Sequence, residues 1–571
     1  MQEKLIEAIC AAASLPVEQV RKNFVRTQDI SHGDFAFPCF QLSRVWKLSP
    51  PECALKLKEL VLLPAGVSRV EVAGPYVNFF LDRGHFSRKV LEGILESGLD
   101  SGKKPVRSET IIVEYSSPNI AKPLHVGHLR NISIGHALEL LYRHLGYKVI
   151  SIDHLGDWGT QFGFVYAGCK LWGRPSDPGI EALVGLYVRA SNLRKAQEEG
   201  CVPAEDADKP DVNQMARDYF KRLEADEPEA MSFWKWCLDI SMDYFEKVYA
   251  RLGVKFDHHM GEAFYRGMIP GVEKMLRESG ILQDSKGALG VDLGKELGFV
   301  RIFTEDGRSL YMTREIATAN YRCETFNPAR ILHVVAMQQE LHFRQFKEIM
   351  RRLKHPAADL VVHVAYGYVP GMKTRQGSAV GLSELLDEAR ERALVAYREE
   401  VTKRPEGVDE TEIAEKVGTG AIIFYLLSHG KNKDMQFSWR EALNFQGDSG
   451  PYVQYALARL NSILGRAAEA GVSLADGFEG ALLDDHNAHE LVVLLSRFSE
   501  TLEKAAADYE PNQIASYALL LARTFSASYQ TLRVLGEEMP LARARLALFT
   551  ALRYVLHTCL GLIGVPPVEK M

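Results

Sequence analysis

The chain has 571 residues, of which 46% are hydrophobic and 25% charged, a balance typical of globular proteins that bury several cores. It has no apolar run of about 18 residues and no secretory signal pattern, so we expect neither a membrane span nor secretion. Its eight scattered cysteines include no C-x-x-C pair, which favours a reducing cytoplasm and argues against a zinc site. A net charge of −6 offers no global attraction for nucleic acid, so such a partner would have to bind local basic patches.

Residues 1–107 are predicted to form a small α+β domain. A helix-like segment opens it, and VEVAGPYVNFFLD (70–82) has the pattern of two strands joined by a turn at Gly74-Pro75. The polar stretch 96–110 that follows is typical of a linker.

A β-α-β unit begins at Thr110. TIIVEY is a short β-branched run, the next helical segment carries Leu138, Leu141 and Leu145 on one face, and KVISIDH is a second strand. Such a unit predicts a parallel sheet with right-handed crossovers, in a doubly wound, Rossmann-like α/β domain over residues 108–380.

The remaining segments have mostly helical patterns. Residues from about 173 to 300 fit no further sheet strand and are interpreted as a helical insertion, and the sheet resumes at 329–337 and 360–369. From about 380 the pattern is helical to the end, which we divide into a connector, 381–440, and an all-α domain, 441–571.

The segment EYSSPNIAKPLHVGHLRN (114–131) lies between the first sheet strand and its helix. Doubly wound folds bind phosphates there, because free backbone N–H groups and the helix dipole favour anions. His125 and His128 can donate to phosphate oxygens, and Lys122 adds a mobile charge. Gly127 has no side chain, so a flat base can lie on the backbone. These residues predict charge stabilisation during attack on an α-phosphate.

Other interpretations of this segment remain open at this point. Two surface histidines at a loop–helix junction are an equal alternative for so short a motif. A metal site is less favoured, because no third ligand lies at a suitable spacing. The pair His258-His259 also invites a metal interpretation, but a turn is preferred there.

Several blocks together resemble one family. The segment 114–131 resembles the HIGH signature of class I aminoacyl-tRNA synthetases, in the form typical of arginyl-tRNA synthetases. HLGDWGTQFG (154–163), LYMTREIATANYR (310–322) and VVAMQQELHFRQF (334–346) resemble later blocks of that catalytic domain. GPYVNFFLD resembles the extra N-terminal domain, and FQGDSGPYVQYALAR resembles the entry to the anticodon-binding domain.

The resemblance implies activation of L-arginine by ATP to arginyl-adenylate, followed by transfer to tRNA-Arg. It also implies Mg²⁺ carried by ATP, no zinc, no membrane partner, a monomer and a cytoplasmic location. A guanidinium is a planar fork of donors that suits carboxylates and amide oxygens. The matching positions are Pro118, Lys122, His125, Gly127 and His128 for ATP and the transition state, and Glu114, Ser117, Asn119, Tyr311, Glu315 and Gln339 for arginine.

One departure from the family pattern lies in the arginine pocket. Glu315 stands where the family usually has aspartate, so the charge is kept and one methylene is added. Thr313 is expected to cap the helix that carries this carboxylate.

A second departure lies in the mobile class I loop, which matches VPGMKTRQGSAV (369–380). Thr374 occupies the place of the second lysine, which clamps ATP phosphates in most class I members. Many arginyl enzymes lack that lysine and carry one just ahead of the HIGH signature, where this chain has Lys122. The resemblance therefore implies that Lys122 replaces the missing lysine, assisted by the ATP-binding residues Met372, Lys373 and Arg375.

The tRNA contacts implied by the resemblance are spread over two domains. The N-terminal domain approaches the tRNA elbow, and the C-terminal domain approaches the anticodon loop. Aromatic rings and a flexible thioether suit splayed bases. The matching positions are Tyr76, Asn78, Tyr452, Tyr455, Arg459 and Met571.

Two other functions are compatible with parts of this pattern. A different H-x-G-H nucleotidyltransferase would need neither the N-terminal domain nor the helical C-terminal block. A non-catalytic, synthetase-like tRNA-binding protein is disfavoured because both histidines, Lys122 and the pocket block are present, although Glu315 keeps it open.

Overall fold

The computed structural model describes residues 2–27, 32–285, 288–304, 310–369, 381–401 and 407–571. The chain divides into two compact units, one of residues 1–101, 460–497 and 523–555 and one of residues 102–459, 498–522 and 556–571. Within the described ranges, no helix is both long and apolar enough to cross a lipid bilayer.

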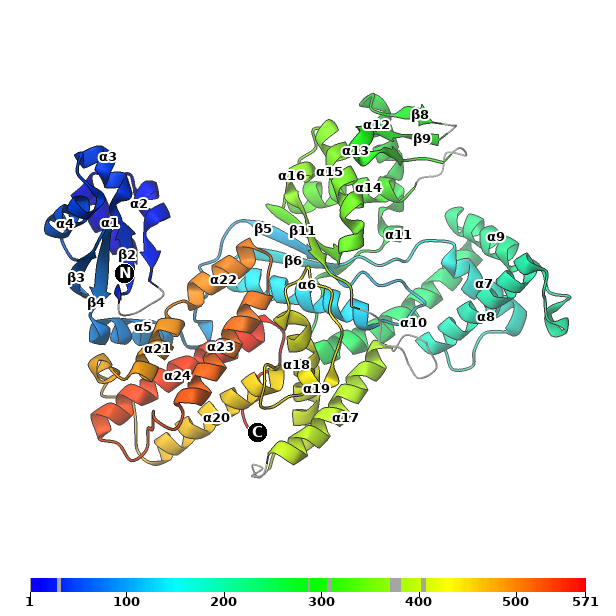
Figure 1. Cartoon of the computed structure of the whole chain (residues 1–571). Coiled ribbons are helices and arrows are strands. Elements are labelled where there is room, and N and C mark those ends of the chain that lie inside the picture. The colour runs from blue at the N-terminus through cyan, green and yellow to red at the C-terminus, as the bar shows by residue number, and fades with distance from the viewer. Residues whose placement is uncertain (1, 28–31, 286–287, 305–309, 370–380, 402–406) are drawn as a thin grey trace. The chain divides into compact units, whose positions relative to one another are not determined.

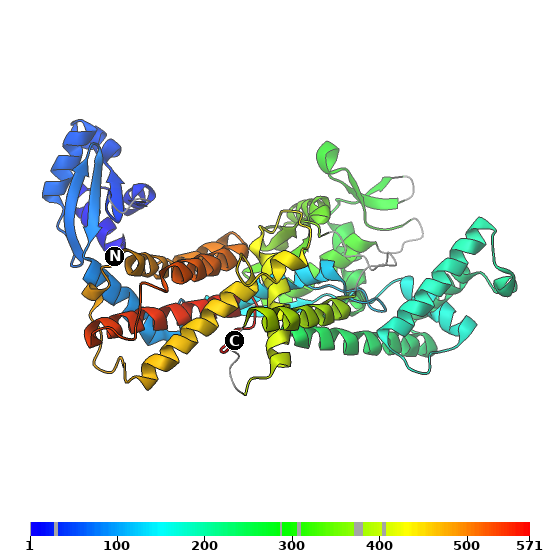
Figure 2. The same cartoon turned by 60° about the horizontal axis from the view of Figure 1, so that its bottom comes forward.

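The first unit opens with an antiparallel sheet in the order β1-β2-β4-β3. Phe35 of β2 pairs with Phe79 of β4, and both side chains are buried beside the ring of Phe24. Helix α4 packs against β3 and β4, and α1 packs against α4, as the labels of Figure 1 and the turned view of Figure 2 let the reader follow. The elements are α1 (Gln2–Ala13), α2 (Val17–Asn23), β1 (Val25–Arg26), β2 (Phe35–Pro38), α3 (Leu42–Trp46), α4 (Pro50–Leu60), β3 (Val67–Ala73) and β4 (Tyr76–Leu81).

Helices complete this unit. Helix α5 (Arg83–Ser97) follows β4 and packs against α21 (His486–Leu495). Three long helices, α20 (Gly450–Glu469), α23 (Asn512–Ser528) and α24 (Met539–Leu562), contribute residues to both units.

The second unit contains a five-stranded sheet in the order β12-β11-β5-β6-β7, all of whose neighbouring strands are parallel (Figure 1). The strand of this sheet that comes first in the chain, β5 (Thr110–Glu114), is central, with β6 (Lys148–Asp153) on one side and β11 (Arg330–Ala336) on the other. The chain therefore winds outward in both directions from β5. In such sheets ligands bind at the carboxyl ends of the two strands where the winding direction changes, here β5 and β11.

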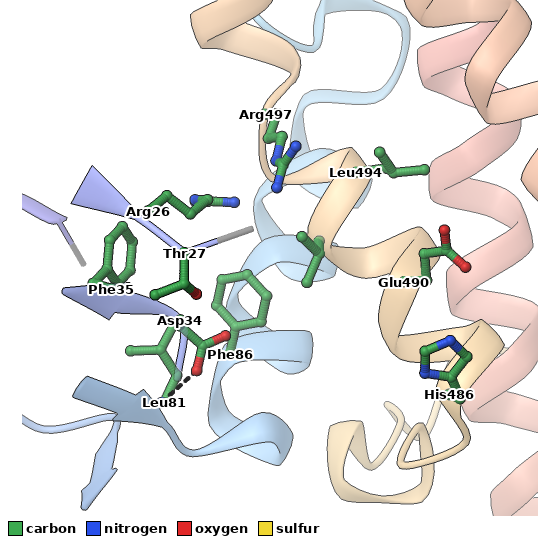
Figure 3. Close-up of a pocket in the computed structure, with 11 residues that line it drawn as sticks. Arg26, Thr27, Asp34, Phe35, Leu81, Phe86, His486, Glu490, Leu494 and Arg497 are labelled. Carbon is green, nitrogen blue, oxygen red and sulfur yellow. Dashed lines mark hydrogen bonds between the residues drawn. The ribbon is translucent and has the colours of Figure 1, made fainter. Parts of the chain in front are cut away.

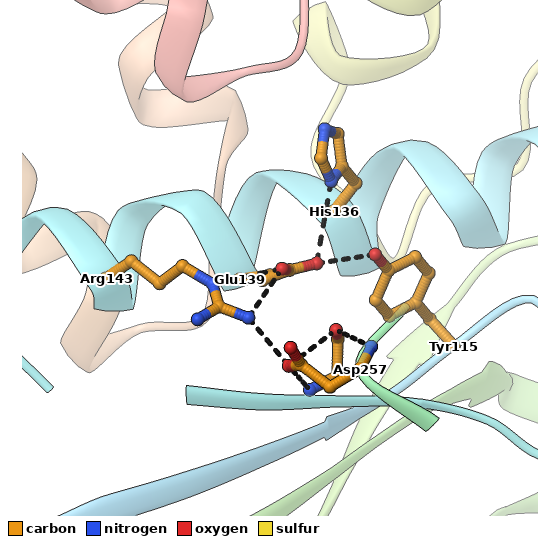
Figure 4. A network of polar contacts seen from close by, with 6 residues as sticks. Tyr115, His136, Glu139, Arg143 and Asp257 are labelled. Atoms are coloured by element: carbon orange, nitrogen blue, oxygen red, sulfur yellow. Dashed lines mark hydrogen bonds and ion pairs between the residues drawn. The ribbon is translucent and has the colours of Figure 1, made fainter. Parts of the chain in front are cut away.

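Helix α6 (Val126–His144) is the crossover between β5 and β6 and is tied to the sheet by polar contacts (Figure 4). The Tyr115 hydroxyl donates to Glu139 at 2.6 Å, and Arg143 bridges Glu139 at 3.0 Å and Asp257 at 2.8 Å. A Cβ at Gly135 would lie 2.2 Å from Cβ of Tyr115, so only glycine allows this approach of helix and strand. The polar contacts and the close approach at Gly135 together fix the helix relative to the end of β5.

The segment predicted as a helical insertion is helical only in part. Its helices are α8 (Ile180–Glu199), α9 (Val212–Glu224), α10 (Pro228–Leu252), α11 (Glu262–Tyr265), α12 (Ile269–Glu278) and α13 (Gly294–Leu297), preceded by α7 (Gln161–Trp172). The expectation that it adds no strand is wrong. His258–His259 form β7, the sheet edge beside β6, instead of a turn, and β8 (Gln283–Ser285), β9 (Ala288–Asp292) and β10 (Phe299–Arg301) form a separate antiparallel sheet.

After the insertion the chain returns to the sheet through α14 (Tyr311–Phe326), β11, α15 (Glu340–Arg352), α16 (Ala357–Leu360) and β12 (Val361–Tyr366). The described residues beyond β12 contain helices and no strand: α17 (Leu382–Glu400), α18 (Glu410–Ser428), α19 (Trp439–Ala442) and α22 (Phe498–Ala507), besides α20, α21, α23 and α24. The predicted fold class is therefore confirmed: a Rossmann-like parallel sheet with an α+β N-terminal domain and a helical C-terminal part.

Candidate active site

The signature histidines form the N-terminus of α6, at the carboxyl end of the central strand. His125 is the N-cap: its Nδ1 accepts the N–H of Gly127, and its own N–H donates to Nδ1 of His128, both at 3.1 Å. The ring centres are 4.0 Å apart. A Cβ at Gly127 would lie 2.9 Å from Cε1 of His125, so glycine is needed for this folded-back ring.

Both histidines are neutral at pH 7. Burial lowers the pKa of His128 to about 3, with a further contribution from the neighbouring His125. Partial burial also lowers the pKa of His125. Because each Nδ1 accepts a backbone N–H, the neutral rings carry their proton on Nε2. Each ring therefore keeps one N–H for a ligand oxygen.

The turn between β5 and α6 has an unusual backbone. Ser116, Ser117 and Ala121 have positive φ angles of 69°, 49° and 59°. Such conformations disfavour side-chain-bearing residues and persist where surrounding contacts impose them. Here the carbonyl of buried Pro118 accepts the N–H of Gly156 at 2.8 Å, and exposed Asn119 pairs with the same glycine.

Asp153, at the end of β6, stabilises this turn through hydrogen bonds. Its buried carboxylate accepts the N–H of Ser117 at 3.2 Å and the hydroxyl of Tyr249 at 3.0 Å, and contacts Nδ1 of His259 at 3.2 Å. The Tyr249 hydroxyl also lies 2.7 Å from Oγ of Ser116. Burial raises the pKa of Asp153 although these partners oppose the shift.

Glu114, predicted to bind arginine, already has partners within the chain. Its buried carboxylate forms an ion pair with the fully buried Arg322 and lies 3.0 Å from Nδ1 of His333. Burial alone would raise the pKa of Glu114, but Arg322 and His333 hold it well below its usual range. The carboxylate is thus charged and fixed at the end of β5.

Tyr311 and Glu315 lie one turn apart at the start of α14. The charge of Glu315, followed by burial and by a hydrogen bond to Glu315, raises the pKa of the Tyr311 hydroxyl, and Glu114 and Glu262 add to the shift. Three carboxylates thus raise the pKa of this hydroxyl, and only Glu315 does so through a hydrogen bond. The Tyr311 ring, half of whose side-chain surface is open to solvent, lies 4.9 Å from His342, and Gln339 is exposed at the N-cap of α15.

Two details of this pocket differ from the sequence analysis. Thr313 does not cap α14: its buried hydroxyl donates to the Ile302 carbonyl at 2.9 Å, and Leu310 is the N-cap. Glu262, which the sequence analysis missed, pairs with Arg314 and has a pKa raised by burial. The only signal for it was an acidic residue at the start of a short helix after the edge strand.

Lys122 is half-buried, and its Nζ lies 5.4 Å from the ring centre of Tyr187 in α8. Met372, Lys373 and Arg375, together with Thr374, lie outside the described residues. The described chain resumes beside the signature histidines. Gly381 forms a β-bridge with His125, and the N–H of Leu382 donates to the Leu124 carbonyl at 2.8 Å. Among the described residues, no three histidine, cysteine or acidic side chains are grouped to hold a metal ion.

The residues predicted to contact tRNA occur in both units. In the first unit, Tyr76 is exposed at the start of β4 whereas Asn78 is buried. In the second, the Arg459 guanidinium lies 5.1 Å from the ring centre of Tyr455. Tyr452 and Tyr455 lie in the first two turns of α20, and Met571 packs against the apolar cluster that includes Tyr397 and Phe445.

A separate cavity lies in the first unit (Figure 3). It has a volume of about 480 Å³ and is lined by residues such as Arg26, Phe35, Phe86, Glu490 and Arg497. None of the predicted site residues lines it, so it is distinct from the candidate active site.

The strand order, the turn after the central strand and the H-x-G-H residues on the following helix define a class I aminoacyl-tRNA synthetase. A family model described as tRNA synthetases class I (R), catalytic domain, matches residues 90–439. Models described as arginyl tRNA synthetase N terminal domain and DALR anticodon binding domain match residues 1–81 and 453–571.

Similar proteins extend along the whole chain. An Arginine–tRNA ligase of Halothermothrix orenii is 37% identical and is covered to 99%, with 100% of this chain aligned, and one of Lactococcus lactis is 38% identical with both chains fully covered. The solved structure of the arginyl-tRNA synthetase of Thermus thermophilus has a TM-score of 0.80 at 25% identity, with 100% of each chain covered. This chain belongs to the arginyl-tRNA synthetase family.

Membership makes the chain an enzyme of the ligase class, in which ATP drives the joining of arginine to tRNA-Arg. A smaller H-x-G-H nucleotidyltransferase does not account for matches that include both the N-terminal and the anticodon-binding models.

Proposed function

We propose that His125, His128 and Gly127 bind ATP at the N-terminus of α6. A carboxylate oxygen of arginine would attack the α-phosphorus of ATP; the new P–O bond gives arginyl-adenylate, and the bond from the α-phosphorus to pyrophosphate breaks, so that pyrophosphate leaves. The Nε2–H groups of the two neutral histidines would donate to phosphate oxygens as negative charge develops on them. Pro118 and Gly127 would contact the nucleotide, and Mg²⁺ would arrive with the triphosphate rather than on dedicated protein ligands.

We propose that the substrate guanidinium binds among the carboxylates around Tyr311. The observation that supports this assignment is the hydrogen bond between the Tyr311 hydroxyl and Glu315, one turn apart on α14, together with the raised pKa of that hydroxyl, to which the charges of Glu114 and Glu262 also contribute. A guanidinium satisfies several acceptors in one plane, whereas a lysine ammonium does not match that fork. Glu315 and Tyr311, half open to solvent, would contact the guanidinium, and Glu114, Ser117, Asn119 and Gln339 would hold the α-amino and carboxylate end.

Lys122 is proposed as the cation that replaces the lysine missing at Thr374. Within the described part of the chain it forms no hydrogen bond or salt bridge, so its charge is available to an anion. Met372, Lys373 and Arg375 would assist from the neighbouring segment.

The domain roles are proposals of the same kind. Residues 1–107 would contact the tRNA elbow through Tyr76 and Asn78, and residues 441–571 the anticodon loop through Tyr452, Tyr455, Arg459 and Met571. Residues 108–380 would carry the chemistry, and 381–440 would connect the two. We propose a cytoplasmic monomer without zinc.

Arginine-dependent ATP–pyrophosphate exchange, with and without tRNA-Arg, tests the proposed reaction. We expect exchange with arginine and not with lysine, and only when tRNA is present. Exchange without tRNA would remove the proposed gating by tRNA, and equal exchange with lysine would contradict the guanidinium site.

Variants of Glu315 test the pocket assignment. Glu315→Ala should raise the KM for arginine roughly 10- to 150-fold, the effect of losing a charged hydrogen-bond acceptor. Glu315→Asp, which restores the family's usual residue, should stay within about threefold of the parent, a small change by the same scale. An unchanged KM in Glu315→Ala would overturn the assignment.

A further inference from the structure

The insertion contacts the Lys122 region at two points. The backbone N–H of the preceding residue, Ala121, donates to Oγ of Ser241 in α10 at 2.8 Å. The side chain of Lys122 ends over the ring of Tyr187 in α8, with Nζ 5.4 Å from its centre. This separation falls within the range of a cation–π interaction. Main chain and ammonium are thus both held by helices of the insertion.

The ring of Tyr187 is itself held in place. Phe164 of α7 meets it edge to face at 6.2 Å between ring centres. Helices α7 and α8 pack so closely that a Cβ at Gly168 would lie 3.0 Å from the Leu186 carbonyl oxygen, and Ala167, Ala190 and Leu193 are buried between them. Tyr187 therefore presents its face from a packed helical hairpin.

The ammonium of Lys122 has no carboxylate beside it, among the described residues, that would compete with a bound phosphate. No carboxylate pairs with it anywhere in the described ranges, although many surface lysines of this chain pair with an acidic residue one turn away, as Lys235 does with Asp239. An aromatic face attracts a cation without neutralising it. A lysine held in this way keeps its full charge for an incoming polyphosphate.

We propose that Tyr187 is a positioning residue that holds the ammonium of Lys122 beside the ATP site, so that the insertion sets the position of the charge that acts on the phosphates. The inference rests on the proposed role of Lys122 and extends it to a residue of the insertion. Tyr187 acts through Lys122 and touches neither substrate.

A double-mutant cycle of Lys122 and Tyr187 tests the coupling in ATP–pyrophosphate exchange with saturating arginine and tRNA-Arg. Tyr187→Leu should lower kcat/KM for ATP roughly two- to fivefold, the effect of losing one partly exposed cation–π contact, and leave the KM for arginine unchanged. Tyr187→Phe keeps the ring face and should restore the loss. In a Lys122→Ala background, Tyr187→Leu should have no further effect.

A control variant separates positioning from loss of the hairpin. Arg189→Ala removes another cation–π pair of α8, in which the guanidinium lies 4.1 Å from the Trp172 ring centre, and should not change kcat/KM for ATP. The proposal fails if Tyr187→Leu behaves like the parent, or if it lowers activity equally with and without Lys122.

Lysine methyl NMR tests the contact without catalysis. After reductive ¹³C-methylation, which keeps the charge, the Lys122 signal is identified by its loss in Lys122→Arg. We expect it to be shifted upfield by the ring, and to move downfield in Tyr187→Leu. An unshifted signal would overturn the inference. A shifted signal with full activity in Lys122→Ala would instead overturn only the proposed role of Lys122 in catalysis, and leave Tyr187 as its structural partner.

Discussion

The proposed arginine side and the proposed ATP side of the candidate site differ in the charge of their titratable groups. On the arginine side, Glu114 is buried as a charged group beside Arg322 and His333. On the proposed ATP side, His125 and His128 pair with no carboxylate among the described residues, and the partial loss of hydration that lowers their pKa values keeps them neutral. The difference matches the charges of the two ligands that we propose for these sides. In this proposal the cationic arginine side chain meets fixed negative charge, whereas the polyanion meets neutral N–H donors and Lys122, which pairs with no carboxylate among the described residues.

Removing the charge on the arginine side should have the largest effect. Glu114→Gln leaves the fully buried Arg322 without its counter-charge. Breaking one member of a buried ion pair costs about 3–5 kcal/mol, because the remaining charge is left desolvated. We expect a loss of that size in the free energy of unfolding, measured by denaturant titration.

Glu315→Gln is the matched control, since Glu315 is only half-buried and lies on the same side of the site. It should cost less than about 1 kcal/mol of stability, as is usual for exposed charges. Equal losses of unfolding free energy in the two variants would show that the buried ion pair of Glu114 contributes no more stability than the half-buried Glu315.

The ATP side should respond in activity rather than in stability. Lys122→Ala removes one preorganised charge and should lower the rate of ATP–pyrophosphate exchange roughly 10²–10³-fold, with little change in the unfolding transition. Lys170→Ala is a suitable control, because Lys170 also lies over an aromatic ring, at 5.3 Å from that of Tyr166, but pairs with Glu229. A loss below threefold in Lys122→Ala would remove the lysine from the mechanism.

The ATP side was also the easier side to predict from sequence. Lys122, His125 and His128 lie within seven consecutive residues, in the loop after β5 and the first turn of α6, so their closeness follows from local geometry. The parallel sheet followed in the same way from apolar runs that flank a helical period. The segment 370–380, by contrast, was matched to the family but lies outside the described residues.

The contacts of the arginine side depend on tertiary packing. Glu114 and Arg322 are far apart in the chain, and nothing in either neighbourhood specifies the other. Glu262 follows an edge strand of only two residues, His258–His259, which is too short to show a period. Thr313 satisfies its hydroxyl on a carbonyl of a preceding segment, so a local capping rule chose the wrong partner.

Weakening the contacts that hold the turn between β5 and α6 should have a smaller effect, which we expect in the KM for arginine and not in the KM for ATP. Tyr249→Phe removes the hydroxyl shared by Asp153 and Ser116, which holds a turn with positive φ angles. A hydrogen bond contributes about 0.5–1.5 kcal/mol, so the KM for arginine should rise roughly two- to tenfold while the KM for ATP stays the same. Tyr219→Phe, which removes a buried hydroxyl bonded to the Ala230 carbonyl in the insertion, should change neither constant. Equal changes in both KM values for Tyr249→Phe would point to a general loss of packing.

The smallest effect is a difference in pH dependence that reports the neutral histidine directly. The pKa of His128 is about 3 in the folded chain and near 6.5 when unfolded. As the pH falls below 6.5, the unfolded chain takes up a proton that the folded chain refuses, so the stability contributed by the neutral ring is lost towards pH 3.

The variant His128→Asn keeps an acceptor for the N–H of His125 and cannot titrate. The parent should therefore lose stability relative to the variant as the pH falls from 6.5 to 5.5, by at most about 1.4 kcal/mol per pH unit. Carboxylates such as Glu114 titrate in both proteins and cancel from the difference. Denaturant midpoints at pH 7.5, 6.5 and 5.5 would measure it, where the pH values are chosen around the unfolded pKa of about 6.5. Parallel curves would mean that His128 accepts a proton as readily in the folded chain, and the contrast between the two sides of the site would then rest on Glu114 alone.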